Sequence, residues 1–248
     1  MILRDYMRHG AVGWGLLFVG VAALLMGCQT TANDEAEAEI ERSNVPFEPA
    51  TYISRLRQLD ARHPTLFNPA STAVWVSSDA AELKMQEEGG LGELDPVAAQ
   101  VTGNFHVFEL HLVSAFHDMS MAADVVDLRG VQVYLETPDG QRISPAQHLR
   151  AGSREEQPEG ALRRFRRTNL VVFPRHSLWM DDLTLDAVYP AVRLVLETHS
   201  SEFYFEWPAV ARPGIEQRAP TAEEQRWLQR LGYDEFVSRL RALGGMFH

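Results

Sequence analysis

The chain has very little cysteine: one residue, Cys28, among 248. A single cysteine forms no intramolecular disulfide and excludes a metal cluster held by several thiolates. Lysine is equally scarce, since Lys84 is the only one and every other fixed positive charge is an arginine. Cys28 therefore needs an explanation outside the folding of the chain.

The signatures of common enzymes are also missing. The sequence contains no Gly-x-Ser-x-Gly elbow, no His-Glu-x-x-His pair, no phosphate-cradling glycine loop and no dinucleotide fingerprint. Catalytic groups can converge from distant positions, so a hydrolase with an unmarked site stays open. The sequence favours a non-enzymatic role.

Excess positive charge is absent as well. The formal net charge is -11, which repels the phosphate backbone and excludes nucleic acid as a main partner. With 45% hydrophobic and 23% charged residues, the composition is that of a globular protein with a core. The chain is long enough for one full-sized domain with appendages.

What is present begins at the N-terminus. Arg4 and Arg8 precede a run from Ala11 to Met26 that is apolar or glycine throughout, which is the form of a secretory signal. The run ends in Leu25-Met26-Gly27-Cys28, which resembles the lipobox of bacterial lipoproteins. That resemblance implies cleavage after Gly27, a lipid in thioether linkage on Cys28 and acylation of the new N-terminus.

The same resemblance implies a location. Gln29 follows the cysteine, whereas an aspartate there favours retention in the inner membrane of Gram-negative bacteria. We therefore expect an anchor in the outer membrane, with the domain facing the periplasm. The alternative is an uncleaved transmembrane anchor, because the apolar run is close to the roughly 20 residues that a span needs. Both interpretations tether the domain to a membrane, outside the cytoplasm.

Composition then divides the chain into four parts. Residues 1–27 form the signal peptide and residues 28–48 an acidic tether. Residues 49–212 form a β-sandwich domain with a leading helix, and residues 213–248 a helical extension. The tether carries Asp34, Glu35, Glu37, Glu39 and Glu41 among alanines, a composition typical of a solvated spacer.

The middle of the chain predicts a mainly β fold. Val131, Val133 and Leu135 alternate with Gln132, Tyr134 and Glu136, which predicts a half-buried strand. The strand runs into the turn Pro138-Asp139-Gly140, which indicates a hairpin. Further alternation lies at 192–196 and 203–207. We expect an antiparallel β-sandwich, immunoglobulin-like in the broad sense, with a small barrel as the alternative. Residues 49–62 have the spacing of a short amphipathic helix, and residues 150–160 have the composition of a polar loop.

The C-terminus predicts a helical pair. Thr221 and Glu224 have the spacing of a capping box for a helix over 222–231 that stops at Gly232. Asp234 is the expected cap of a second helix through about residue 243. Each helix has one apolar face, which either packs on the sandwich or binds a protein partner in the envelope.

Two clusters are candidates for binding. His117, Met119 and Met121 combine an imidazole with thioethers, ligands that suit copper, although a strand end with packed methionines has the same sequence. The second cluster is Arg163, Arg164, Arg166 and Arg167 around Phe165. These guanidinium groups could clamp an anionic lipid, a lipopolysaccharide phosphate or a glycan carboxylate, or pair internally with acids on an edge strand.

The sequence thus favours a membrane-tethered envelope lipoprotein, a non-enzymatic binding or structural module for a protein or envelope-polymer partner. It needs no cofactor beyond the covalent lipid on Cys28. The alternative is a periplasmic copper-binding lipoprotein that uses His117, Met119 and Met121.

Lipidation can be tested directly. Cells that express the chain and grow with radiolabelled palmitate should label the unaltered protein, and Cys28→Ser should lose the label because the acceptor thiol is gone. The measurement is autoradiography of the immunoprecipitated protein. Label retained by Cys28→Ser would show that the lipid is not attached through this residue.

Overall fold

The computed structural model describes residues 45–59, 65–87, 94–116, 119–177, 183–210, 221–230 and 232–245, without the side chains of residues 119–121. The chain divides into two units, Met1–Val45 and Pro46–His248, and the architecture below belongs to the second. The signal segment and Cys28 lie outside the described residues. Among the helices of the described ranges, none has both the length and the hydropathy of a membrane span.

Two antiparallel sheets form the second unit. The first sheet has the strand order β1 (Ile53–Arg55), β3 (Thr72–Val76), β4 (Phe105–Val113), β8 (Leu162–Pro174) and β7 (Gln147–Glu159). The second sheet has the order β2 (Arg57–Gln58), β10 (Glu202–Pro208), β9 (Ala191–Glu197), β5 (Gln132–Glu136) and β6 (Arg142–Ile143). The prediction of a mainly β fold is confirmed, and so is the predicted hairpin, where Leu135 pairs with Ile143.

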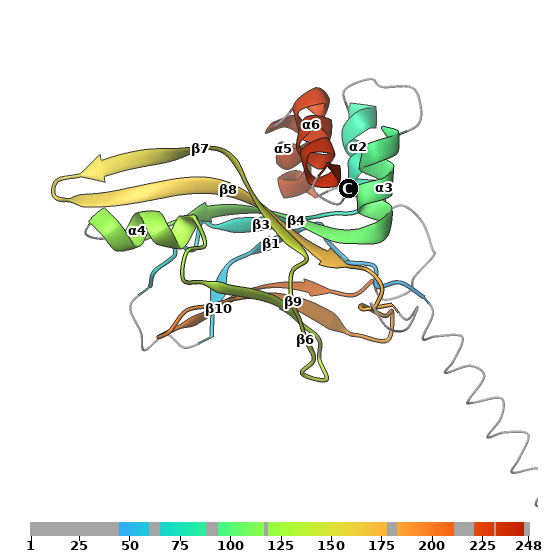
Figure 1. Ribbon diagram of the computed structural model, residues 1–248, viewed down its shortest axis with the longest axis horizontal. Coiled ribbons are helices and arrows are strands. Elements are labelled where there is room, and N and C mark those ends of the chain that lie inside the picture. Colours follow the sequence, from blue (N-terminus) through green and yellow to red (C-terminus); the bar gives the residue numbers. More distant parts are fainter. Residues whose placement is uncertain are drawn as a thin grey trace, which may run out of the picture. The chain divides into compact units, whose positions relative to one another are not determined.

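Among the described elements, the helices lie against the first sheet. Figure 1 shows four of them grouped on its outer side: α2 (Ser78–Glu87), α3 (Pro96–Asn104), α5 (Ala222–Arg230) and α6 (Tyr233–Gly244). The fifth, α4 (Met119–Val126), lies along the β7–β8 hairpin. The helices α2 and α3 are inserted between β3 and β4, which pair directly with each other.

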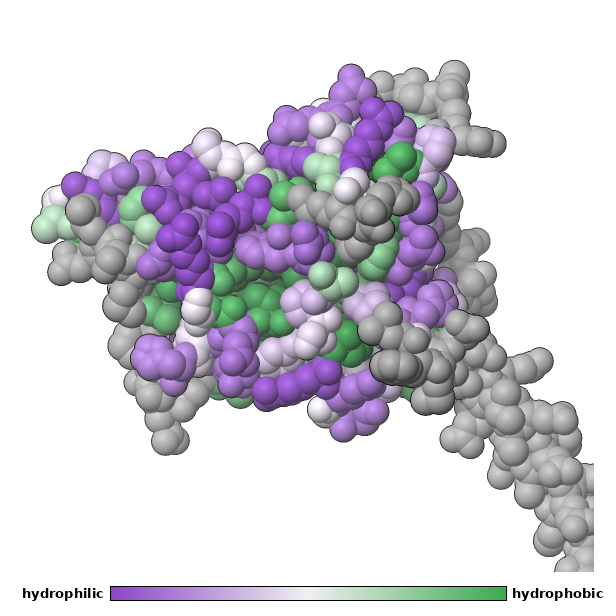
Figure 2. All heavy atoms as spheres, viewed as in Figure 1, coloured by the Kyte–Doolittle hydropathy of each residue, from purple (hydrophilic) through white to green (hydrophobic). Residues whose placement is uncertain are grey.

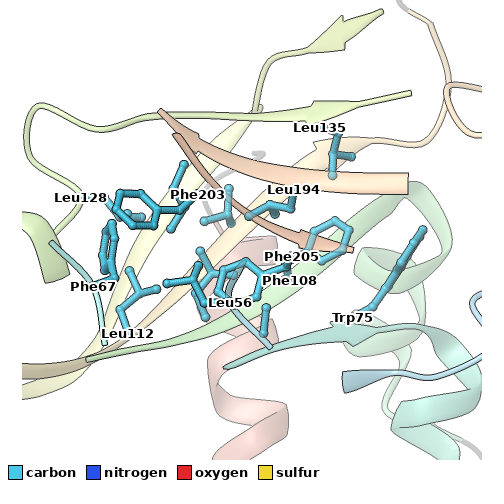
Figure 3. Packing of buried hydrophobic residues seen from close by; sticks show 14 of the residues in the cluster. Leu56, Phe67, Trp75, Phe108, Leu112, Leu128, Leu135, Leu194, Phe203 and Phe205 are labelled. Carbon is cyan, nitrogen blue, oxygen red and sulfur yellow. The ribbon is translucent and has the colours of Figure 1, made fainter. Parts of the chain in front are cut away.

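The main core lies between the two sheets and is rich in aromatic rings. Trp207 of β10 meets Trp75 of β3 with ring centroids 5.8 Å apart and Phe108 of β4 at 5.0 Å. Leu194 and Phe205 add aliphatic and aromatic surface from the second sheet (Figure 3). All these side chains are buried, so the two sheets are joined by burial of large apolar groups.

A second core lies between the first sheet and its helices. Val74, Val76 and Val107 alternate with the residues that face the main core, and they pack with Trp227 and Leu240 of the C-terminal helices. Strands β3 and β4 are therefore covered on both faces. The apolar faces of the predicted helical pair are occupied within the chain.

The C-terminal pair follows the predicted pattern closely. Glu224 accepts a hydrogen bond from the backbone N–H of Thr221 at 2.7 Å, and its own N–H donates to Thr221 Oγ1 at 3.3 Å, which confirms the capping box. Glu224 also accepts from the backbone N–H of Tyr52 at 2.6 Å, which ties α5 to the chain before β1. The predicted cap of the second helix is wrong: Gly232 is the N-cap, and Asp234 lies in the first turn.

The only lysine of the chain is fully buried in this helical layer. Lys84, near the end of α2, donates to the backbone carbonyl of Leu228 in α5, and its ammonium lies 5.2 Å from the Trp227 ring centroid. Cations stabilise the exposed carbonyls at a helix C-terminus. Lys84 therefore fixes α2 against α5 and is not a surface charge.

The predicted leading helix over 49–62 is wrong. The chain forms β1 and β2 there, and it passes from the first sheet to the second at Leu56. Ile53 packs on the core beside the helices, whereas Leu56 is buried in the core between the sheets. Apolar residues that serve two cores on opposite sides can mimic the spacing of a single helical face.

Two further predictions fail for related reasons. Residues 150–159 belong to β7, which pairs with β8 along its length with one irregularity between Ala151 and Glu155, so they are a strand and not a loop, and only Gly160 lies in the turn. Residues 119–126 form α4 instead of a strand end. The outer part of β7 is exposed and so has no alternation of apolar and polar residues, and the eight residues of α4 are too few for a helical repeat of apolar residues to be recognised.

The contact between α6 and α3 depends on Gly244. A Cβ at this position would lie 2.8 Å from Val97 Cγ1 and 3.3 Å from Val101 Cγ2. Both neighbours are β-branched and stiff. We expect Gly244→Ala to lower the free energy of unfolding by about 1–3 kcal/mol, measured by urea denaturation.

The matched control is Gly103→Ala, because Gly103 is also helical but a Cβ there meets nothing within 4 Å. It should be neutral or stabilise by up to about 1 kcal/mol. Equal destabilisation by the two substitutions would contradict the packing role assigned to Gly244.

Candidate functional site on the arginine-rich hairpin

The four predicted arginines lie on β8, where Arg166 and Arg167 end the pairing with β4 and Arg163 and Arg164 belong to the part of the β7–β8 hairpin that extends beyond it. Strand β8 pairs with β4 from Pro174 as far as Arg166, opposite Val113. From Phe165 to Leu162 the ladder of β8 continues only with β7. The edge strand of the first sheet is β7, so the expectation of an edge strand is wrong for Arg166 and Arg167, whereas the stretch with Arg163 and Arg164 has a ladder partner on one side only. Much of the hairpin surface is hydrophilic on the face shown in Figure 2.

Strand alternation divides the arginines between the two faces of the hairpin. Arg163 and Arg167 share one face and both have acidic partners. Arg163 Nε lies 2.9 Å from Glu156 Oε1 on β7. Arg167 Nη1 lies 3.2 Å from Asp127 Oδ1, just after α4, and Arg167 Nη2 donates to the carbonyl of Gly152 at 3.3 Å. These two guanidinium groups are engaged in holding the hairpin.

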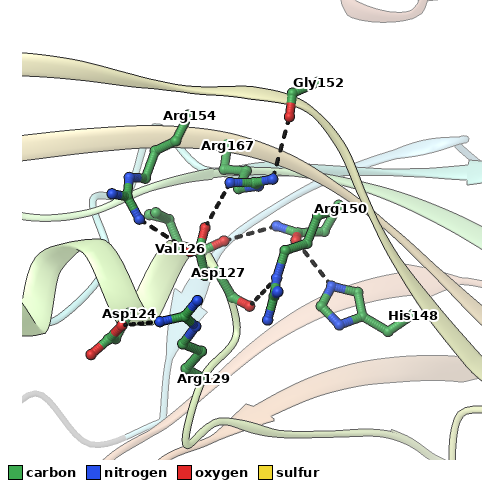
Figure 4. Close-up of polar contacts among 10 residues, drawn as sticks. Asp124, Val126, Asp127, Arg129, His148, Arg150, Gly152, Arg154 and Arg167 are labelled. Carbon is green, nitrogen blue, oxygen red and sulfur yellow. Dashed lines mark hydrogen bonds and ion pairs between the residues drawn. The ribbon is translucent and has the colours of Figure 1, made fainter.

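Asp127 is the centre of the polar contacts at the base of the hairpin, which we call the Asp127 anchor, and its side chain is almost fully buried. Besides Arg167, it receives Arg154 of β7, whose Nη1 lies 3.1 Å from Asp127 Oδ2. Two side chains bond the carbonyls at the end of α4: Arg150 Nε donates to Asp127 O at 3.3 Å, and Asn169 Nδ2 donates to Val126 O at 2.9 Å (Figure 4). These donors satisfy carbonyls that a helix end leaves without partners.

His148 of β7 also belongs to the Asp127 anchor, through its contact with Asn169. Because Asn169 donates through Nδ2, its Oδ1 is the acceptor, and it lies 3.0 Å from His148 Nε2. His148 therefore donates from Nε2. Leu128 follows Asp127 with φ 56°, a left-handed conformation that turns the chain from α4 toward β5. The polar cluster fixes the angle at which the hairpin leaves the sheet.

Arg164 and Arg166 lie on the opposite face, and within the described ranges neither has an acidic partner. The Arg164 guanidinium stacks on Phe116, with Cζ 3.8 Å from the ring centroid, and its Nε is buried without a hydrogen-bond partner. Arg166 is exposed opposite Glu155. Leu162, two positions before Arg164, is 43% exposed. This face combines two available cations with exposed apolar groups, a composition typical of binding surfaces.

The remaining predicted site residues fall largely outside the described ranges. Cys28 and His117 are not described, and Met119 and Met121 belong to the first turns of α4, where only the backbone is described. In the part of the chain that the structure describes, no three His, Cys, Asp or Glu side chains come together as a metal site. Copper binding by His117, Met119 and Met121 stays a prediction.

A second polar cluster, which the sequence did not single out, lies under α6 on the first sheet. Glu109 is buried, accepts from Arg239 Nη1 at 3.1 Å, and lies 3.3 Å from His111 Nε2. The Nδ1 of His111 faces Thr168 Oγ1 at 3.2 Å. In the sequence, the feature that marks this cluster is the spacing of Glu109 and His111, which places both side chains on one face of a strand. The cluster joins α6 to the sheet, because Arg239 of α6 pairs with the buried carboxylate of Glu109 on β4.

Burial lowers the pKa of His111 from its ordinary value, with Arg239 and Arg230 acting in the same direction and Glu109 opposing them. His106, on the other face of β4, is buried beside Trp75, and neither of its ring nitrogens has a partner. Burial, aided by Arg175 and His176, holds the pKa of His106 well below its ordinary value. Both imidazoles are therefore neutral in the folded protein near pH 7.

These two histidines should make the fold sensitive to acid. Below about pH 6.5 the unfolded chain takes up protons at both positions while the folded protein does not. The contribution of the two histidines to the free energy of unfolding is therefore fully present above that pH and is lost as the pH falls below it. The free energy of unfolding should fall by up to about 1.4 kcal/mol per pH unit per histidine between pH 6.5 and 5. Urea denaturation at a series of pH values measures the slope.

His106→Phe should reduce that slope by the contribution of one proton, whatever it does to stability at pH 7. The exposed His199 offers a control, and His199→Gln should keep the slope of the unaltered protein. An unchanged slope in His106→Phe would contradict the assignment.

In comparisons with known proteins, no protein-family model, no curated protein sequence and no solved structure matches the chain.

Proposed function

We propose that this chain is a membrane-tethered binding module of the bacterial cell envelope, without enzymatic activity. It is anchored in the outer membrane through a lipid on Cys28, and the acidic residues 28–48 separate the domain from the bilayer. The fold is an immunoglobulin-like sandwich in the broad sense. The support for the anchor is the lipobox-like sequence, and the support for a binding role is the outer face of the hairpin.

The observation that carries the proposal is the uneven use of arginine on β8. Arg163 and Arg167 are engaged with Glu156 and Asp127, whereas Arg164 and Arg166 are left for a partner. Arg164 is half-buried and has no acidic partner among the described residues, so an anionic group can pair with the accessible side of its guanidinium. We call the surface formed by Phe116, Leu162, Arg164 and Arg166 the hairpin surface. It lies on an element held rigidly by the Asp127 anchor, which suits recognition without a catalytic pocket.

A partner that used the C-terminal helices would have to meet their polar faces. Trp227, Phe236 and Leu240 are buried in the core beside the first sheet, so the apolar side of each helix has no area left to offer. The hairpin surface has both exposed apolar and cationic groups and therefore fits a protein or envelope-polymer partner better.

The test is photo-crosslinking in living cells. A photoreactive amino acid replaces Leu162 in the full chain, or, as the control, Val188, which is also an exposed apolar residue at 56%. We expect adducts from position 162 and few from position 188. Arg164→Gln with Arg166→Gln should reduce the adducts at 162 by at least about fivefold, as expected when two charge-assisted hydrogen bonds are lost.

The chemical nature of the adduct, whether protein, glycan or lipid, then identifies the class of partner. Equal adducts at both positions, or adducts that persist in the double variant, would overturn the hairpin surface as the binding site. Catalytic turnover of a substrate by the purified chain would overturn the non-enzymatic role.

A further inference from the structure

We propose that the hairpin surface docks on the surface of a lipid bilayer that contains anionic lipids. This inference rests on the proposed function and names the partner of the same surface. Leu162 would enter the interface between headgroups and acyl chains, and Arg164 and Arg166 would contact phosphate groups. Phe116 would support the Arg164 guanidinium from beneath.

The arrangement of side chains is that of an interfacial contact. Leu162, Arg164 and Arg166 are two positions apart on one strand and so project from the same face. Leu162 stands at the far end of the hairpin, next to the turn at Gly160, and is one of the few large exposed apolar side chains among the described residues. An apolar residue flanked by arginines partitions into anionic membrane interfaces because both the hydrophobic and the electrostatic terms are favourable there.

The exposed leucine favours a bilayer over a soluble anionic polymer. Arg164 and Arg166 alone would suit either, but a hydrated polymer offers no apolar phase for Leu162. The phenyl ring under Arg164 also lowers the hydration of the guanidinium on one side, at 3.8 Å from the ring centroid. Such a cation is suited to an interface with low water content.

Acidic residues on the same face limit the attraction. In the strand register, Glu159 lies opposite Leu162 and Glu155 lies opposite Arg166. Contact with the bilayer should therefore be weak, reversible and sensitive to salt. Substitution of Glu159 by a neutral residue should therefore strengthen the contact with the bilayer.

The tether does not prevent this contact. Residues 29–45 can extend to at most about 60 Å. A compact domain of about 200 residues has a radius of gyration of about 17 Å. An anchored domain on such a tether can present any of its faces to the membrane.

Hydrogen–deuterium exchange measures the contact in the full chain. The protein is reconstituted into vesicles of phosphatidylcholine alone, or of phosphatidylcholine with phosphatidylglycerol, so that the anchor is inserted in both. We expect slower exchange in peptides that cover 155–166 only in the anionic vesicles, reversed by high salt. Peptides from β9 and β10 should exchange equally in both, which also shows that the fold is intact.

Variants identify the residues. Arg164→Gln with Arg166→Gln should abolish the protection, since each arginine near an anionic surface contributes about fivefold to binding. Leu162→Asp should do the same, and Glu159→Gln should increase the protection. The matched control is Arg55→Gln with Arg57→Gln, which removes the same charge from arginines that are 68% and 62% exposed on other strands. It should retain the protection.

A third arm separates the classes of partner. Heparin, a soluble anionic polymer, is added to the protein in phosphatidylcholine vesicles. Protection of 155–166 by heparin equal to that by anionic vesicles would overturn the bilayer proposal while sustaining a binding role for the hairpin surface. Absence of protection in every arm would also overturn it, and the crosslinks from position 162 would then decide the proposed function independently.

Discussion

Trp207 packs against Trp75 and Phe108 across the space between the two sheets, and the positions of the other elements follow from this contact. It fixes which face of β3 and β4 looks toward the second sheet. Alternation along those strands then sends Val74, Val76 and Val107 to the opposite face, which would be an exposed apolar surface if nothing covered it. The four helices of the outer layer cover it. One sheet is consequently buried on both sides, and the other keeps a solvated face.

The same alternation decides what the arginines of β8 can do. Asp127 and the carbonyl of Gly152 are the partners of the largely buried Arg167, and the half-exposed Glu156 is the partner of Arg163. Asp127 also concentrates Arg154 and Arg150 at the end of α4. The long hairpin thus has a fixed base although little of its outer part touches the sheet. A rigid support with two unengaged cations is the feature on which the proposed binding role depends.

Local signals predicted some elements well. The alternation around Val133 gave a hairpin whose register is now seen, and Thr221 with Glu224 gave a capping box whose two hydrogen bonds are present. Asp95 before Pro96 is an equally clear helix start, since its side chain accepts hydrogen bonds from Val97 N and Ala98 N. The failures have a common cause. Ile53 and Leu56 serve two cores, and the outer half of β7 serves none, so neither segment shows the single apolar face from which elements are predicted.

The sequence by itself determined the lone cysteine and its lipobox-like setting, the acidic composition of residues 28–48, the mainly β character and the C-terminal helical pair. Each of these is encoded by neighbours within a few residues, so local composition and periodicity suffice. Only the tertiary structure decided which arginines of β8 are engaged, because Arg167 and Asp127 are distant in the sequence and meet only when α4 packs under the hairpin. It also decided that Lys84, a surface residue by its type, is buried against α5. The function of a charged side chain depends on the partners that folding brings next to it, and partners that are distant in the sequence cannot be identified from local composition or periodicity.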